Sequence, residues 1–211
     1  MRGKYTPAHD KRQEIRRPES FCIVFARKEG EYCIIVVEDV AMYILAPDEK
    51  ATLAMAYTRN MLIRGEAVTK ESMRVSVWLR TEGAPNYIHL LNANVIVFGG
   101  GTPKSLSYSE FYVPVQETLA FHIAPPQSDP LDYDPDEKNR SMDFVTILLG
   151  TFSMKGKIRF SSQTGMGASL EVARAAWMSL YEVDVSNPFL PQLSLHVPMM
   201  LVRPFNVGYG V

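Results

Sequence analysis

The chain has 211 residues, 46% of them hydrophobic, and its 22 Lys and Arg against 23 Asp and Glu give a formal net charge of −1 at pH 7. This length suits one large or two small domains, and the near-neutral charge excludes recruitment of nucleic acid or acidic membrane by a global positive field. No run approaches the roughly 20 apolar residues of a membrane helix, and the N-terminus lacks the apolar core of a secretion signal. We therefore expect a cytoplasmic protein without a membrane span.

Residues 1–19 form a polar, mildly basic segment without hydrophobic periodicity. We expect a flexible arm that only a partner would order. A solvated tail is favoured over an arm that binds nucleic acid or lipid headgroups. Its basic residues are Arg2, Lys4, Lys11, Arg12, Arg16 and Arg17.

Residues 20–53 are rich in apolar and β-branched residues, which predicts an N-terminal β-hairpin extension. Cys22 and Cys33 lie in strand-like runs on either side of the turn Lys28-Glu29-Gly30-Glu31. A tight turn there would not set the two cysteines directly opposite each other. Two reduced, buried thiols are therefore favoured over a disulfide or a redox switch.

Pro47 with acidic residues behind it predicts a short helix to about Met55, or a turn leading into another strand. Beyond it the chain contains two similar stretches, residues 54–124 and 143–211. Such self-similarity is typical of an internal duplication, and its changes in spacing fall in loops, where insertions are tolerated. The matched pairs are Gly65/Gly156, Leu79/Leu170, Val95/Val185, Pro114/Pro198 and Phe121/Phe205.

Both stretches show the alternation of apolar and polar residues that is typical of half-buried strands, for example over Val75–Leu79. The long run Tyr87–Phe98 should bend midway. Ser169–Trp177 has helical composition, which predicts a helical turn with Ser169 as its N-cap. Several short strands with a bent central one suggest a small closed barrel. We therefore predict an all-β fold with two tandem β-barrels and short helical turns.

Residues 125–142 are acidic and rich in proline, and cannot bury a core, so they predict a stiff, exposed linker. The run from Asp132 to Asp143 has a spacing similar to that of a calcium loop. Glu137 stands where such a loop requires glycine, and Pro135 stiffens the run. A solvated linker is favoured over a calcium site.

The order of strand, glycine-centred strand, short loop or helix, bent strand and closing hairpin resembles the Sm-like small β-barrel. Arg64-Gly65-Glu66 and Lys155-Gly156-Lys157 carry this resemblance, which covers both stretches but not residues 1–50. The family's Asn-bearing loop and Arg-Gly tail signature are missing. The resemblance implies a barrel architecture and transfers no RNA-binding residues.

Motifs for catalysis or cofactor binding fail on their spacing. The loop Phe98–Ser105 contains three glycines and Lys104, but it lacks the phosphate-loop pattern and Pro103 removes a donor, so a turn between strands is favoured. The four histidines lie in different segments without metal-ligand spacing. Gly165–Ser169 is not a nucleophile elbow. We expect no enzymatic activity, no cofactor and no metal.

The C-terminal run from Leu193 to Val211 stays apolar, which predicts docking into its own sheet or against another subunit. We expect a non-enzymatic binding or assembly module, a subunit or scaffold of a larger complex that binds protein partners or itself. Candidate interaction residues are Gly99, Gly100, Gly101, Lys104, Lys155, Lys157, Arg159, Met199, Met200 and Arg203.

Two alternative functions remain open from the sequence. One is Sm-like RNA binding through the basic arm and the cations of residues 155–159, which the net charge does not support. The other is a small-ligand regulatory barrel with a pocket around Trp78, Tyr87 and Phe98.

Overall fold

The computed structural model describes residues 23–28, 31–36 and 43–211, apart from residues 82 and 173–174. The chain divides into two units, residues 1–42 and 43–211, which are described separately. The predicted arm, residues 1–19, and Cys22 lie outside the described residues. The described part is mainly β with two short α-helices, so the all-β prediction is confirmed.

In the first unit, β1 (Ile23–Lys28) and β2 (Glu31–Val36) form an antiparallel hairpin. Lys28 pairs with Glu31, and residues 29–30 of the predicted turn lie outside the described residues. Cys33 pairs with Ala26 in this register.

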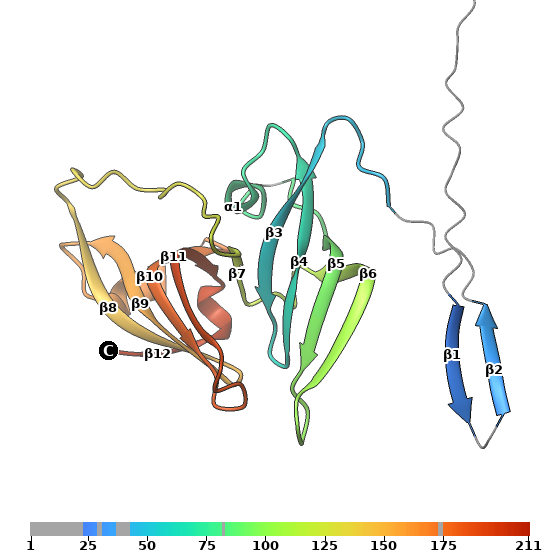
Figure 1. Cartoon of the computed structure of the whole chain (residues 1–211). Coiled ribbons are helices and arrows are strands. Elements are labelled where there is room, and N and C mark those ends of the chain that lie inside the picture. The colour runs from blue at the N-terminus through green and yellow to red at the C-terminus, as the bar shows by residue number, and fades with distance from the viewer. Residues whose placement is uncertain (1–22, 29–30, 37–42, 82, 173–174) are drawn as a thin grey trace, which may run out of the picture. The chain divides into compact units, whose positions relative to one another are not determined.

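The second unit contains one antiparallel sheet of ten strands (Figure 1). In chain order the strands are β3 (Glu49–Tyr57), β4 (Met61–Lys70), β5 (Tyr87–Val97), β6 (Lys104–Pro114), β7 (Ala120–Ile123), β8 (Arg140–Leu149), β9 (Phe152–Ser161), β10 (Met178–Ser186), β11 (Ser194–Val202) and β12 (Gly208–Gly210). The helices are α1 (Val75–Trp78), α2 (Met166–Val172) and the 3-10 helix η1 (Pro204–Asn206).

The strand order across the sheet is β12-β8-β9-β10-β11-β7-β3-β4-β5-β6. Strands β3–β7 make up an N-terminal half, residues 49–123, and β8–β12 a C-terminal half, residues 140–210. In each half the fifth strand lies beside the first, followed by the second, third and fourth, and a short helix follows the second strand. The halves meet where β11 pairs with β7, which we call the internal junction. Their division into two domains and the closure of either into a barrel stay predictions.

Each half also contains a bulge at the same place in its strand order. The β4–β5 register shifts around Gly65, and the β9–β10 register shifts around Gly156. The bulged strands carry Asn92 and Glu182, each with φ of 50°. Because a bulge bends its strand, this is the bend predicted within the run Tyr87–Phe98.

The two glycines opposite the bulges leave no room for a side chain. A Cβ at Gly65 would lie 3.0 Å from the carbonyl oxygen of Leu91, and a Cβ at Gly156 would lie 2.9 Å from that of Tyr181. The glycines therefore let the bulged backbone approach closely.

Several local predictions need correction. Val75–Trp78 is the helix α1 and not a strand. Val75 and Leu79 are both buried, and residues four apart share one face of a helix, so their apolar spacing fits a helical turn as well as a strand. Ser169 lies inside α2 and is not its N-cap. Its Oγ lies 2.8 Å from the Thr164 hydroxyl.

Two matched pairs of the sequence comparison also differ in strand pairing. Phe121 lies in β7 and pairs with Ala56 of β3, whereas Phe205 lies in η1. Pro114 ends β6, whereas Pro198 lies within β11.

Segment boundaries shift as well. Pro47 lies in a turn that leads into β3, so the predicted turn before a strand is confirmed and the alternative short helix is wrong. Strand β3 begins at Glu49, inside the predicted extension 20–53, and β8 begins at Arg140, inside the predicted linker 125–142. Both strands belong to the ten-stranded sheet.

The described residues of the second unit form two apolar clusters, and both contain residues from each half. In the first, the ring of Phe152 meets Tyr57 and Phe98 edge-on, with centroids 5.1 and 5.3 Å apart. In the second, Trp177 and Leu201 from the C-terminal half pack among residues of the N-terminal half. Because the halves share their core, residues 43–211 form one compact unit.

Candidate interaction surface

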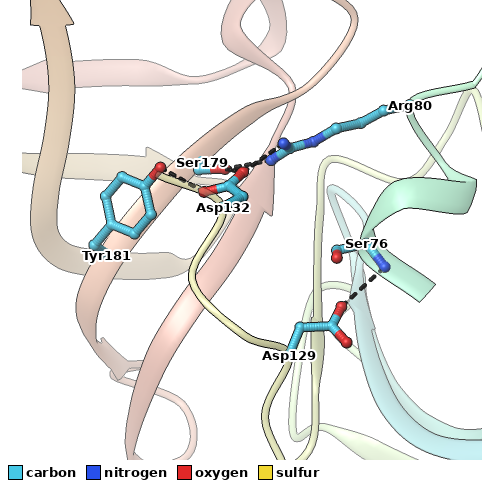
Figure 2. Close-up of polar contacts among 6 residues, drawn as sticks. All are labelled: Ser76, Arg80, Asp129, Asp132, Ser179 and Tyr181. Atoms are coloured by element: carbon cyan, nitrogen blue, oxygen red, sulfur yellow. Dashed lines mark hydrogen bonds and ion pairs between the residues drawn. The ribbon is translucent and has the colours of Figure 1, made fainter. Parts of the chain in front are cut away.

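The acidic linker is fastened to both halves by Asp132 (Figure 2). Its carboxylate accepts hydrogen bonds from the hydroxyls of Ser179 and Tyr181 on β10, each at 2.6 Å. It also pairs at 2.5 Å with Arg80, which follows α1 in the N-terminal half and donates in addition to Ser179. A second linker carboxylate, Asp129, accepts the backbone N–H of Ser76 at 3.0 Å.

The surroundings of Asp132 keep it ionised. Burial opposes ionisation, but hydrogen bonds from Ser179, Tyr181 and Arg80 outweigh it and hold the pKa of this carboxyl below its usual value. Burial, and then the bond to Asp132, raises the pKa of Tyr181. The ionised Asp132 therefore holds the linker against both halves through the Tyr181 hydroxyl and the Arg80 guanidinium. The prediction of a solvated linker is wrong at Asp132.

The cations of β9 differ in their freedom to bind a partner. Arg159 is held by the linker: it donates to the carbonyl oxygen of Asp134 at 2.8 Å, pairs with Glu137 at 2.8 Å and covers the ring of Tyr133. Lys157 lies 5.3 Å from the Phe144 ring centroid. Lys155 is exposed.

The methionines of β11 are core residues. Met199 and Met200 are buried beside the internal junction, so their side chains are not on the surface of this chain. This corrects their selection as surface residues. They belong to the strand that the sequence expected to dock.

Arg203 fastens the end of β11 to the N-terminal half. It donates through Nε to the carbonyl oxygen of Thr118 at 2.9 Å and through a terminal nitrogen to that of Val115 at 2.8 Å. Its guanidinium lies 4.6 Å from the centre of the Trp177 ring. The guanidinium of Arg203 therefore stabilises the internal junction and is engaged within the chain.

The glycine loop is an exposed turn between β5 and β6. Gly99, Gly100 and Gly101 are all exposed, and Gly100 has φ of 63°. Lys104, the first residue of β6, is also exposed. No heavy atom outside their chain neighbours lies within 4 Å of a Cβ built on any of the three glycines.

The residues of the ligand-pocket hypothesis occupy different surroundings. Phe98 is buried in the first cluster, Trp78 borders the second, and Tyr87 is exposed. The described residues contain no group of three or more His, Cys, Asp or Glu side chains that could hold a metal. No described helix is long and apolar enough to cross a membrane.

Several exposed apolar side chains lie on the strands near the two ends of the sheet. At the β6 end, Tyr112 stacks on His89 with centroids 4.4 Å apart, and both side chains contact Glu110 through hydrogen bonds of 2.8 and 2.9 Å. These contacts hold the exposed Tyr112 ring in place. Tyr87, Leu106 and Tyr108 are also exposed on β5 and β6.

At the β12 end, Phe144 and Leu148 of β8 and the terminal Val211 are exposed. An open hollow of about 340 Å³ is lined by residues that include Phe144, Lys155, Glu182 and Val211. Within residues 43–211, the described strands pair with only one side of β6 and of β12.

The sequence predicts interaction at the loop before β6, at Lys104 in β6 and along the C-terminal run that contains β12, but it does not predict that β6 and β12 end the sheet or that Asp132 contacts both halves. Arg80, Ser179 and Tyr181 lie about 50 residues from Asp132 along the chain, and no local pattern reports such a contact. Comparisons with family models, curated proteins and solved structures find no match for this chain.

Proposed function

We propose that this protein is a non-enzymatic assembly module that binds protein through the two outer strands of its ten-stranded sheet. The observation that carries the proposal is that β6 and β12 end the sheet with one unpaired side each among the described residues, beside exposed aromatic and aliphatic side chains. Unpaired strand edges of this kind are templates for pairing with another chain. The module would act as a subunit of a larger, cytoplasmic complex.

We also propose that the two halves descend from one duplicated unit, for which the Sm-like barrel remains the architectural analogy. The shared strand order, the shared place of the helices and the two bulges at Gly65 and Gly156 support this origin. RNA binding is less well supported, because Arg159 is engaged by Glu137 and Asp134 and the net charge is −1.

Light scattering over a concentration series tests the assembly proposal. We expect an average mass above the 23.8 kDa of one chain, rising with concentration. Tyr112→Lys should lower it, because a lysine at a strand edge opposes pairing. Gln163→Lys, the same change of charge at an exposed loop residue, is the control.

Capture from the native host gives a second readout, because the partner could be a different protein. A chain that stays monomeric at every concentration, and that captures the same proteins with or without Tyr112→Lys, would contradict the proposal.

A further inference from the structure

The internal junction shows how one edge of a half pairs with the other half. Strand β11, the fourth of the C-terminal half, pairs antiparallel with β7, the fifth of the N-terminal half, with Leu201 opposite Phe121 and Val202 opposite Ala120. The backbone N–H of Arg203 extends the pairing by donating to the carbonyl oxygen of Leu119 at 2.9 Å.

The two strands that end the sheet hold the same places in their halves as the two strands of the internal junction, but each lacks a described partner on its outer side. Strand β6 is the fourth of the N-terminal half, and β12 is the fifth of the C-terminal half. We infer that β6 of one copy pairs with β12 of the next copy in the register of the internal junction; this inference rests on the proposed assembly function and names a second copy of the chain as the partner.

The bulges fix which residues of β6 correspond to those of β11. Asn92 and Glu182 have the same φ at the two bulges, and three residues before them stand His89 and Ser179. His89 pairs with Tyr112, and Ser179 pairs with Leu201. Tyr112 therefore corresponds to Leu201.

The correspondence between β12 and β7 follows from their first-strand neighbours. Ala56 and Ile147 each lie two residues after the residue that pairs with a bulge glycine. Ala56 pairs with Phe121, and Ile147 pairs with Tyr209. Tyr209 therefore corresponds to Phe121, so that Tyr112 of one copy would lie opposite Tyr209 of the next.

By the same correspondence, three side chains that the internal junction buries each match an exposed side chain at an end of the sheet. Trp177 matches Tyr87, Leu201 matches Tyr112, and Tyr57 matches Leu148. Trp177 and Leu201 pack into the N-terminal half, and Tyr57 packs on Phe152 of the C-terminal half. The exposed fractions are 4% for Trp177 against 54% for Tyr87, 1% for Leu201 against 52% for Tyr112, and 0% for Tyr57 against 57% for Leu148. Contact between copies would cover all three exposed side chains and remove apolar surface from water.

The backbone of β6 is oriented for this pairing. The N–H of Val115 donates to the carbonyl oxygen of Asn86 at 2.9 Å, so Val115 faces β5. Backbone groups alternate in direction along an antiparallel strand, so the N–H and C=O of Tyr112 point away from β5 toward the unpaired side.

The contact between copies would be weaker than the internal junction. Pro114, at the position that corresponds to Arg203, has no N–H to donate. It also lacks the guanidinium that bonds Thr118 and Val115 in the internal junction. Association should therefore be reversible and concentration-dependent. Because each contact uses two different strands, it is head-to-tail and leads to a ring or a filament.

Cross-linking between two variants of the full chain tests the inference. With Cys22 and Cys33 replaced by serine, chains carrying Tyr112→Cys are mixed with chains carrying Tyr209→Cys and treated with a short bismaleimide. We expect a covalent dimer of twice 23.8 kDa in the mixture and none with either variant alone. Ser107→Cys replaces Tyr112→Cys as the register control, because it is exposed on the same strand about 17 Å away.

A second pair guards against misfolding at Tyr209, whose hydroxyl donates to the carbonyl oxygen of Pro204. Glu110→Cys lies two residues away from Tyr112 in β6, and Val211→Cys lies two residues beyond Tyr209, just after the end of β12; Val211 is almost fully exposed. Cross-linking in this pair also supports the inference.

The possible failures are distinguishable. If the wild-type mass exceeds one chain but neither cysteine pair cross-links, the inference is wrong while the assembly function stands. Dimers of Tyr112→Cys alone would mean that β6 pairs with β6, and equal yield from Ser107→Cys would mean a different register; either result overturns the inference. A monomer without an edge-dependent partner overturns both proposals.

Discussion

His122 is a buried histidine that should couple the stability of residues 43–211 to pH. Its Nδ1 lies 2.8 Å from the carbonyl oxygen of Ile123, and its Nε2 lies 2.9 Å from the hydroxyl of Tyr57. With Nδ1 as the donor, Nε2 accepts from the Tyr57 hydroxyl, so the neutral ring satisfies both contacts. Burial lowers the pKa of His122 from 6.5 to about 4, although the bond to Ile123 opposes the shift.

The size of the effect follows from this shift. The unfolded chain takes up a proton near pH 6.5, whereas the folded chain does so only near pH 4. The contribution of neutral His122 to stability is therefore complete above pH 6.5 and falls as the pH drops toward 4. At 1.36 kcal/mol per pH unit, lowering the pH from 7 to 5 should cost about 2 kcal/mol.

Urea denaturation of the wild type and of His122→Gln at both pH values is the assay. Glutamine cannot take up this proton, so the variant should be less stable at pH 7 but should lose about 2 kcal/mol less than the wild type between pH 7 and pH 5. Carboxylates titrate in both chains, so the comparison cancels their effect. Equal losses in the two chains would refute the reasoning.

Three further substitutions test contacts that shape the second unit. Gly156→Ala should cost about 1–3 kcal/mol, because the new Cβ would lie 2.9 Å from the carbonyl oxygen of Tyr181. Asp132→Asn should cost about 1–2 kcal/mol, because it removes the charge that pairs with Arg80. Arg203→Ala should cost about 2–3 kcal/mol, because it removes two hydrogen bonds across the internal junction. The free energy of unfolding in urea measures each change.

Matched controls separate these effects from the chemistry of the substitution. Gly165→Ala places its Cβ in open space, and Asp136→Asn changes an exposed linker carboxylate. Both should leave the free energy of unfolding nearly unchanged. Losses as large as those of Gly156→Ala and Asp132→Asn would contradict the assigned contacts.

The sequence predicts those features of the fold that depend on near neighbours. Alternating residues predict the strands, and the length of the run Tyr87–Phe98 predicts its bend. The period fails at Val75–Leu79, because apolar residues four apart satisfy a strand and a single helical turn equally. In the folded chain Val77, which a strand would bury together with Val75 and Leu79, is exposed, as a helical turn requires.

The interaction surface depends on contacts that are distant in the chain. The sequence predicts that the apolar β11 docks against another element or subunit. Whether Met199 and Met200 are buried within the chain or exposed to a partner depends on β7, about 80 residues earlier. The acidic linker has a disordered composition, yet Asp132 finds partners on both halves. Pairing between remote segments also decides that β6 and β12, and not other strands, end the sheet.

The linker fastened at Asp132 has a consequence for dilution. It joins the two halves covalently, so β11 and β7 meet at an effective concentration that a linker of this length sets at the order of millimolar. Lowering the protein concentration cannot separate them. A contact between chains has no such covalent link and should dissociate on dilution. The product of that dissociation would be a monomer whose two halves stay paired.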